Sequence, residues 1–256
     1  MDEARRNVVD RERDFHNERF AQAEDPRKHL DKWYWAIRHG AMQQDTQVKE
    51  LATGADVLEY GCSTGGWSLD ALQLPAVCRS LVGIDISDVA VERANSRARQ
   101  IGAANRAQFL AMNAEAMEFP DASFDLVYGR GIIHHLDLER CFAEVSRVLR
   151  PGGVASFFEP MGHNPVLNAY RRRTPDMRTP DEHPLLVTDF ALARRYFADV
   201  EVRYFGLFSV ASAMVPSVAR GVTYAAGCGI DALVLTLPYV NRFAWYALVS
   251  LRKPAH

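Results

Sequence analysis

Apolar and polar positions along this chain follow two patterns, one typical of strands and one typical of helices. Short runs rich in apolar, β-branched and aromatic residues predict strands at 57–60, 81–86, 107–112, 124–128, 154–158, 200–209 and 244–251. Amphipathic or helix-favouring segments predict helices at 11–23, 28–42, 67–74, 88–101, 138–149 and 186–197, with a break near Asp25-Pro26 and with 46–51 leading into the first strand. Strands that alternate with helices indicate an α/β domain built on a parallel sheet.

The first strand, Val57-Leu58-Glu59-Tyr60, runs directly into a glycine-rich turn that contains Gly61, Gly65 and Gly66. Glycine allows positive φ and lets a ligand approach the backbone closely. The helix predicted after the turn would present free N–H groups and a partial positive charge. A strand, a glycine turn and a helix in this order are typical of nucleotide-like ligand sites in doubly wound sheets.

The second strand, LVGIDI, carries an acidic residue near its end. Asp85 follows Gly65 by about 20 residues, the spacing that places a carboxylate of the neighbouring parallel strand beside the turn. Such a carboxylate can accept hydrogen bonds from both hydroxyls of a ribose. We therefore expect a ribose-containing ligand at this edge of the sheet.

Two such ligands fit this pattern, a dinucleotide and S-adenosylmethionine. The three glycines of the dinucleotide fingerprint G-x-G-x-x-G align with Gly61, Ser63 and Gly66 here. Serine therefore occupies the position at which the second glycine would let the backbone approach a pyrophosphate. Glu59 at the strand end would repel phosphates and would favour an ammonium or sulfonium group. An NAD-dependent oxidoreductase remains an alternative, although no catalytic Tyr-x-x-x-Lys pair is found.

The motifs VLEYGCSTGG, VGIDIS, NAE at 113–115, FDLVYGRGIIHHL and LRPGG occur in this order. Together, over about 57–160, they resemble the class I S-adenosylmethionine-dependent methyltransferases of the small-molecule type. Ser63 departs from the family pattern, which has glycine there. The resemblance implies a Rossmann-like, seven-stranded, mostly parallel sheet with helices on both faces and an N-terminal helical lid. It also implies S-adenosyl-L-methionine as cofactor and S-adenosyl-L-homocysteine as product.

The resemblance also assigns the cofactor contacts, by position within the matching motifs. We expect these residues to be Glu59, Gly61, Cys62, Gly65, Asp85, Ile86, Asn113, Ala114, Glu115 and Arg130. Asn113-Ala114-Glu115 would contact the adenine, although a polar turn with a helix cap at Asn113 explains the same residues without a ligand.

Methyl transfer requires in-line geometry and exclusion of water, and an oxygen nucleophile would also need a general base. His163 and His134 are the candidate bases, and the predicted acceptor contacts are Phe15, His16, Trp33, Tyr34, Asn164 and Tyr170. The aromatic residues among them could instead dock a helical cap on the domain. No metal is predicted, because adjacent histidines such as His134 and His135 point in different directions and no third ligand has suitable spacing.

One domain accounts for the whole chain. We divide it into a helical cap at 1–45, a cofactor-binding core at 46–160, a substrate loop and helix at 161–195, and the last two strands at 196–256. An apolar insertion at 210–240 has only two charged side chains, Arg220 and Asp231. Asp231 and three glycines within 221–240 argue against a membrane-spanning helix. A helical cover over the substrate, core packing and a helix on a membrane surface remain open.

Composition narrows the classes of function. The 256 residues carry a net charge of −2, which argues against nonspecific binding of nucleic acid. The four cysteines have no metal-ligand or disulfide spacing, and the charged N-terminus shows no secretion signal, so we expect a cytoplasmic protein. The predicted partner is a small, partly apolar acceptor. Both a monomer and a homodimer fit, and a cofactor-binding scaffold without methyl transfer remains an alternative.

Overall fold

A computed structural model describes residues 3–21, 31–174, 179 and 181–255 of the chain. The strands are β1 Asp56–Tyr60, β2 Ser80–Asp85, β3 Ala107–Ala111, β4 Phe124–Arg130, β5 Leu149–Pro160, β6 Asp199–Phe205 and β7 Tyr246–Arg252. The α-helices are α1 Glu3–Ala21, α2 Asp31–Tyr34, α3 Arg38–Ala52, α4 Asp88–Gln100, α5 Leu138–Val148, α6 Pro165–Arg173, α7 Asp189–Ala193 and α8 Ser217–Val234. Short helical turns occupy Trp35–Ile37, Gly66–Ala71, Leu74–Ala76, Ile133–His135, Ser209–Met214 and Asn241–Phe243.

The strands form one seven-stranded sheet in the order β3-β2-β1-β4-β5-β7-β6. The strands β1 to β5 are parallel to one another, and β7 is antiparallel to both β5 and β6. The chain order reverses between β1 and β4, so this is the switch point at which ligands bind in such sheets. The predicted seven-stranded, mostly parallel α/β fold is confirmed.

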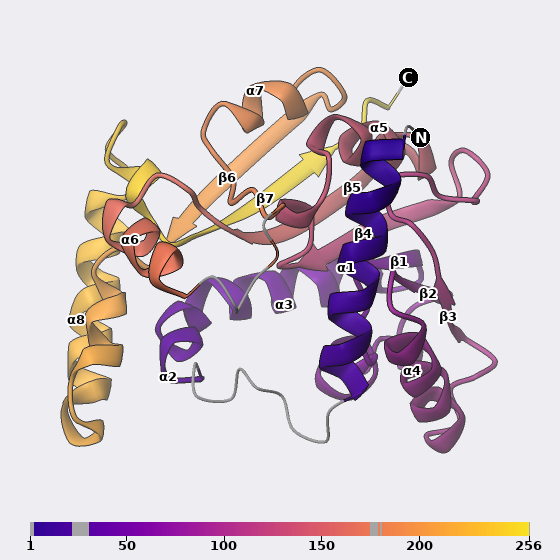
Figure 1. Ribbon diagram of the computed structural model, residues 1–256, viewed down its shortest axis with the longest axis horizontal. Coiled ribbons are helices and arrows are strands. Elements are labelled where there is room, and N and C mark those ends of the chain that lie inside the picture. Colours follow the sequence, from indigo (N-terminus) through magenta and orange to yellow (C-terminus); the bar gives the residue numbers. More distant parts are fainter. Residues whose placement is uncertain (1–2, 22–30, 175–178, 180, 256) are drawn as a thin grey trace.

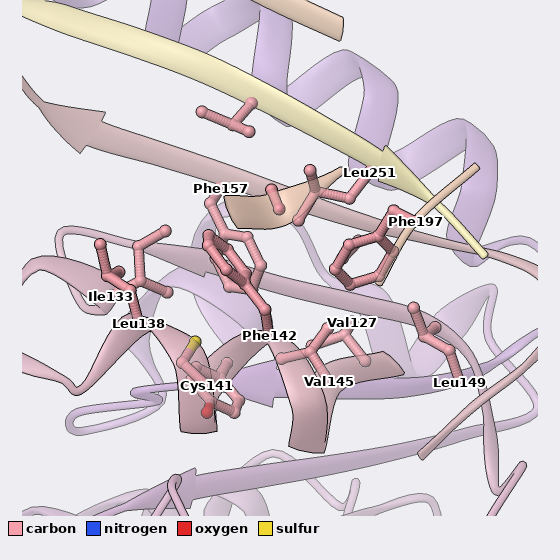
Figure 2. Packing of buried hydrophobic residues seen from close by; sticks show 14 of the residues in the cluster. Val127, Ile133, Leu138, Cys141, Phe142, Val145, Leu149, Phe157, Phe197 and Leu251 are labelled. Carbon is pink, nitrogen blue, oxygen red and sulfur yellow. The ribbon is translucent and has the colours of Figure 1, made fainter. Parts of the chain in front are cut away.

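Alternating side chains of the central strands fill two separate cores. Leu58 and Tyr60 of β1 face the core formed with α5 and α7, whereas Val57 faces the core formed with α3 and α4. In Figure 2 the rings of Phe142, Phe157 and Phe197 gather between α5 and the sheet. Burial on both faces explains why the strands are nearly continuous apolar runs in the sequence.

Helix α1 crosses the carboxyl ends of the central strands (Figure 1). Arg5 pairs with Glu115 after β3, and the Asn17 side chain accepts a hydrogen bond from the Ser87 hydroxyl at 2.6 Å. The predicted N-terminal helical cap is therefore present over the ligand-binding edge. It begins at Glu3, earlier than predicted, while Asp25, Pro26 and Lys28 lie outside the described residues.

Several predicted boundaries were wrong. Residues 46–51 do not lead into a strand but continue α3, because Gln44, Val48 and Ala52 form a buried helical stripe against the sheet. Strand β5 begins at Leu149 rather than at 154, since a register shift against β4 absorbs the Pro151-Gly152 turn within the strand. The helix predicted at 67–74 is one wide turn and a short 3₁₀ turn, and that at 186–197 is only Asp189–Ala193.

The apolar insertion forms the short turn Ser209–Met214 and α8, which stand apart from α1 at the side of the molecule near β6 (Figure 1). Buried Asp231 holds this unit together. Its carboxylate accepts hydrogen bonds from the backbone N–H of Phe208 at 2.7 Å and of Ser209 at 3.2 Å, and from the Ser209 hydroxyl at 2.8 Å. None of the helices in the described residues is sufficiently long and apolar to traverse a bilayer.

Asp231→Ala is expected to lower the free energy of unfolding by roughly 2–4 kcal/mol, because several buried donors lose their acceptor at once. Asp231→Asn keeps one acceptor oxygen and should lose less. Urea unfolding followed by circular dichroism measures both variants. Equal stability of the alanine variant and the wild type would show that this carboxylate does not hold the insertion in place.

Candidate active site

A cavity of about 170 Å³ lies between α1 and the carboxyl ends of the central strands. Eight of the predicted site residues line it: His16, Gly61, Asp85, Ile86, Asn113, Ala114, Glu115 and Arg130. They come from α1, from the turn after β1, from the end of β2 and the residue after it, from the turn after β3, and from the end of β4. The topology thus brings together residues that are far apart in the sequence, at the switch point of the sheet.

The turn after β1 requires left-handed backbone at three positions. Gly61 has φ of 76° and Gly65 has φ of 75°. A Cβ at Gly61 would lie 2.8 Å from the Ile132 side chain, so glycine is needed there for space as well. Ser63 has φ of 50°, a conformation that costs a residue with a Cβ roughly 1–2 kcal/mol. The glycine that the family has at this position would adopt the same left-handed backbone without that cost.

Asp85 fixes this turn. Its two carboxylate oxygens accept hydrogen bonds from the backbone N–H groups of Ser63 at 2.8 Å and of Ser87 at 2.9 Å. The carboxylate is therefore held in one orientation at the cavity wall, between the glycine turn and the start of α4. Each oxygen retains a lone pair for a ligand hydroxyl.

Glu115 and Arg130 line the cavity but already bind other protein groups. The Glu115 carboxylate pairs with Arg5 and accepts the Asp137 N–H at 2.8 Å, which ties α1 to the sheet. Arg130 donates to Gln44 and to Asp45, and its guanidinium lies 4.1 Å from the centre of the Trp67 ring. Burial lowers the pKa of Arg130, and Asp45 opposes this shift.

Glu59, Cys62 and Gly65, which were predicted to bind cofactor, do not line the cavity. Cys62 and Glu59 are buried within the domain. Burial raises the pKa of Glu59 to about 8; the Ser68 hydroxyl opposes this shift and the charge of Asp85 adds to it. Its Oε2 atom and the Tyr128 hydroxyl make no hydrogen bond within the described part of the chain.

The two candidate bases do not line the cavity. The Nδ1 of His134 lies 2.7 Å from Glu159 Oε2 in the interior, and burial together with His135 lowers the pKa of His134. His163 accepts a hydrogen bond from the Val187 N–H at 3.1 Å through Nε2. In this structure both histidines therefore make contacts that support the fold.

Among the predicted acceptor contacts, only His16 lines the cavity. Phe15 packs edge-on against His16, with ring centres 5.4 Å apart. Tyr34 stacks on Trp245, and Asn164 caps α6 and donates to the Phe243 carbonyl. Trp33, beside Lys32, and the exposed Tyr170 also lie away from the cavity lining.

Two lining residues that were missing from the predicted site stand out, Glu12 and His135. Glu12 Oε2 lies 3.3 Å from His135 Nδ1 and 3.5 Å from His16 Nε2. Burial alone would raise the pKa of Glu12, but the imidazoles outweigh burial and lower it. The i,i+4 spacing of Glu12 and His16 would have placed both on one face of the predicted helix, but the facing His135 is a contact across the fold.

Comparisons with known proteins agree with this architecture. A family model described as a methyltransferase domain matches residues 57–153. The sterol 24-C-methyltransferase erg6 of Aspergillus fumigatus is 34% identical over 167 residues, which are 64% of this chain and 40% of that protein. The chain thus spans less than half the length of this relative.

Residues 57–153 thus match a methyltransferase-domain model, and the sheet around them has the seven, mostly parallel strands that the resemblance to class I S-adenosylmethionine-dependent methyltransferases implies. Solved structures share its fold. The phosphoethanolamine N-methyltransferase 2 of Haemonchus contortus, in complex with phosphomonomethylethanolamine and S-adenosylhomocysteine, aligns with a TM-score of 0.63 and 19% identity over 94% of this chain and 60% of that one. The [4+2]-cyclase SpnF aligns with a TM-score of 0.56 and 22% identity over 84% and 82% of the two chains.

Proposed function

We propose that this methyltransferase domain binds S-adenosylmethionine and transfers its methyl group to a small, partly apolar acceptor by in-line displacement. The observation that carries the proposal is the single cavity shared by Gly61, Asp85 and Asn113, three positions that the family motifs assign to the cofactor. The ligand named in the Haemonchus structure supports the same cofactor here. The product would be S-adenosylhomocysteine.

Helix α1 provides the acceptor side of the proposed site. Val8, Val9 and Phe20 of α1 line the cavity together with Ile132 and Leu136, and this apolar lining supports a partly apolar acceptor. The insertion 210–240 contributes no lining residue, so the acceptor preference rests on α1 and not on that insertion. A closed helix over the site would exclude water during displacement at the sulfonium methyl group.

Calorimetry on the purified chain tests the first half of the proposal. We expect S-adenosylhomocysteine to bind at one site and NAD not to bind, because Ser63 narrows the turn where a pyrophosphate would sit. Formation of S-adenosylhomocysteine with a panel of sterol-like, polyketide-like and amine acceptors tests the second half. Binding of NAD in preference to S-adenosylhomocysteine would overturn the assignment.

A cofactor-binding protein that does not transfer methyl groups is the second candidate. The likeness to a [4+2]-cyclase supports it, because that protein shares the fold and its name describes no methyl transfer. The two candidates differ in one measurement. Under the second, S-adenosylhomocysteine would bind as tightly as expected, but no acceptor in the panel would yield it from S-adenosylmethionine.

A further inference from the structure

We propose that Glu12, His16 and His135 bind one divalent transition-metal ion, Zn²⁺ by the chemistry of the ligands, at the contact between α1 and the rest of the domain. These residues come from two elements, α1 and the short turn Ile133–His135 after β4. One ligand atom from each residue lies within 4.8 Å of the other two. All three residues also line the cavity assigned to cofactor and acceptor.

The distances fit shared coordination better than hydrogen bonding. Glu12 Oε2 lies 3.3 Å from His135 Nδ1 and 3.5 Å from His16 Nε2. Charge-assisted hydrogen bonds are shorter, about 2.7–2.9 Å. Ligand atoms about 2.1 Å from a tetrahedral Zn²⁺ lie about 3.4 Å apart, close to both observed values.

The atoms that would bind the ion also lack other partners. Glu12 Oε2 and His135 Nδ1 are buried and make no hydrogen bond within the described residues. The Glu12 side chain is 9% exposed, and its other oxygen accepts a hydrogen bond from the Thr179 hydroxyl. Thr179 thus orients the carboxylate and leaves Oε2 facing the imidazoles. Buried polar atoms without partners are rare in folded proteins, and a missing ion is one of the accepted explanations.

Two imidazoles and one carboxylate form a donor set that suits Zn²⁺ and related ions, and leave a coordination position open. A second trio, His134, His135 and Glu182, shares His135. His134 and Glu182 do not line the cavity, and neither has a buried polar atom without a hydrogen bond within the described residues. We therefore assign the ion to the trio that contains Glu12 and His16.

The role of the ion rests on the proposed function. An acceptor hydroxyl at the open position would lose its proton to water more readily, because bound cations lower the pKa of coordinated oxygens. The O–CH₃ bond would then form as the S–CH₃ bond breaks, and the sulfur would keep the electron pair as a neutral thioether. The ion would also hold α1 closed over the site, since α1 supplies two of its ligands.

Metal binding is tested on the full chain, without a histidine tag and stripped with a chelator. We expect one equivalent of Zn²⁺ by calorimetry and elemental analysis, and Co²⁺ should give the visible absorption of a tetrahedral or five-coordinate site. Glu12→Gln, His16→Ala and His135→Ala should each weaken Zn²⁺ binding on the order of 100-fold. Thermal melts verify that each variant is folded.

His183→Ala is the matched control, because His183 also contacts a carboxylate, Asp189, at 3.1 Å, but outside the trio. Its Zn²⁺ affinity should equal that of the wild type. No Zn²⁺ binding by the wild-type chain, an equal loss in the control, or a loss in Glu182→Gln but not in His16→Ala would overturn the assignment. Binding of S-adenosylhomocysteine by the stripped protein separates the two proposals, since the methyltransferase assignment stands if that ligand binds and Zn²⁺ does not.

Discussion

Asp85→Ala is expected to weaken binding of S-adenosylhomocysteine by roughly 2–3 kcal/mol, or about 30- to 150-fold. The variant loses a charged acceptor for the ribose hydroxyls. It also loses the acceptor that holds the Ser63 and Ser87 N–H groups, so the glycine turn is less well ordered before the ligand arrives. Calorimetry at a fixed salt concentration, on protein verified as folded by circular dichroism, measures the loss.

Two further variants separate charge, turn geometry and general effects. Asp85→Asn keeps one acceptor oxygen for the turn but removes the charge, so its affinity should fall between those of the wild type and the alanine variant. Asp70→Ala removes a surface carboxylate that pairs with Arg97, and its ligand affinity should not change. If folded Asp85→Ala binds S-adenosylhomocysteine as the wild type does, the proposed placement of the ribose is wrong.

Glu59→Gln is expected to stabilise the protein near neutral pH and to flatten its pH dependence. Burial raises the pKa of Glu59 to about 8 in the folded protein, whereas an unfolded chain releases this proton near its ordinary pKa of about 4.3. The folded state therefore holds a proton that the unfolded state has lost. Stability from this group is present below the unfolded value and is lost as the pH rises towards about 8.

The measurement is the difference in free energy of unfolding between Glu59→Gln and the wild type, from urea titrations at several pH values between 5 and 8. The difference should grow in favour of the glutamine variant by about 1 kcal/mol per pH unit. Other groups titrate alike in both proteins and cancel in the difference. A difference that stays constant over this range would show that Glu59 ionises without penalty in the fold.

The sequence alone determined the strands that carry the glycine turn and Asp85. The strands between 57 and 128 could be predicted because their side chains are buried on both faces, and such burial leaves nearly continuous apolar runs. The spacing of the Gly61 turn and Asp85 follows from the length of one strand–helix–strand unit, which is a local property of the chain. The structure accordingly places Gly61, Asp85 and Asn113 in the lining of one cavity, and their contact with the cofactor stays a prediction.

Only the tertiary structure decided how α1 packs over the cavity. Arg5 and Glu115 are separated by 110 positions along the chain, so no local pattern could pair them or place α1 over the cavity. The same docking brings Glu12 to His135, and it leaves His163 and Trp33 outside the cavity lining. In the sequence, Asp231 is likewise an isolated charge in an apolar segment. Only the structure shows that its carboxylate accepts hydrogen bonds from the N–H groups of Phe208 and Ser209. Contacts of this kind depend on which surfaces meet after folding, and hydrophobic periodicity records only which face of each element is buried.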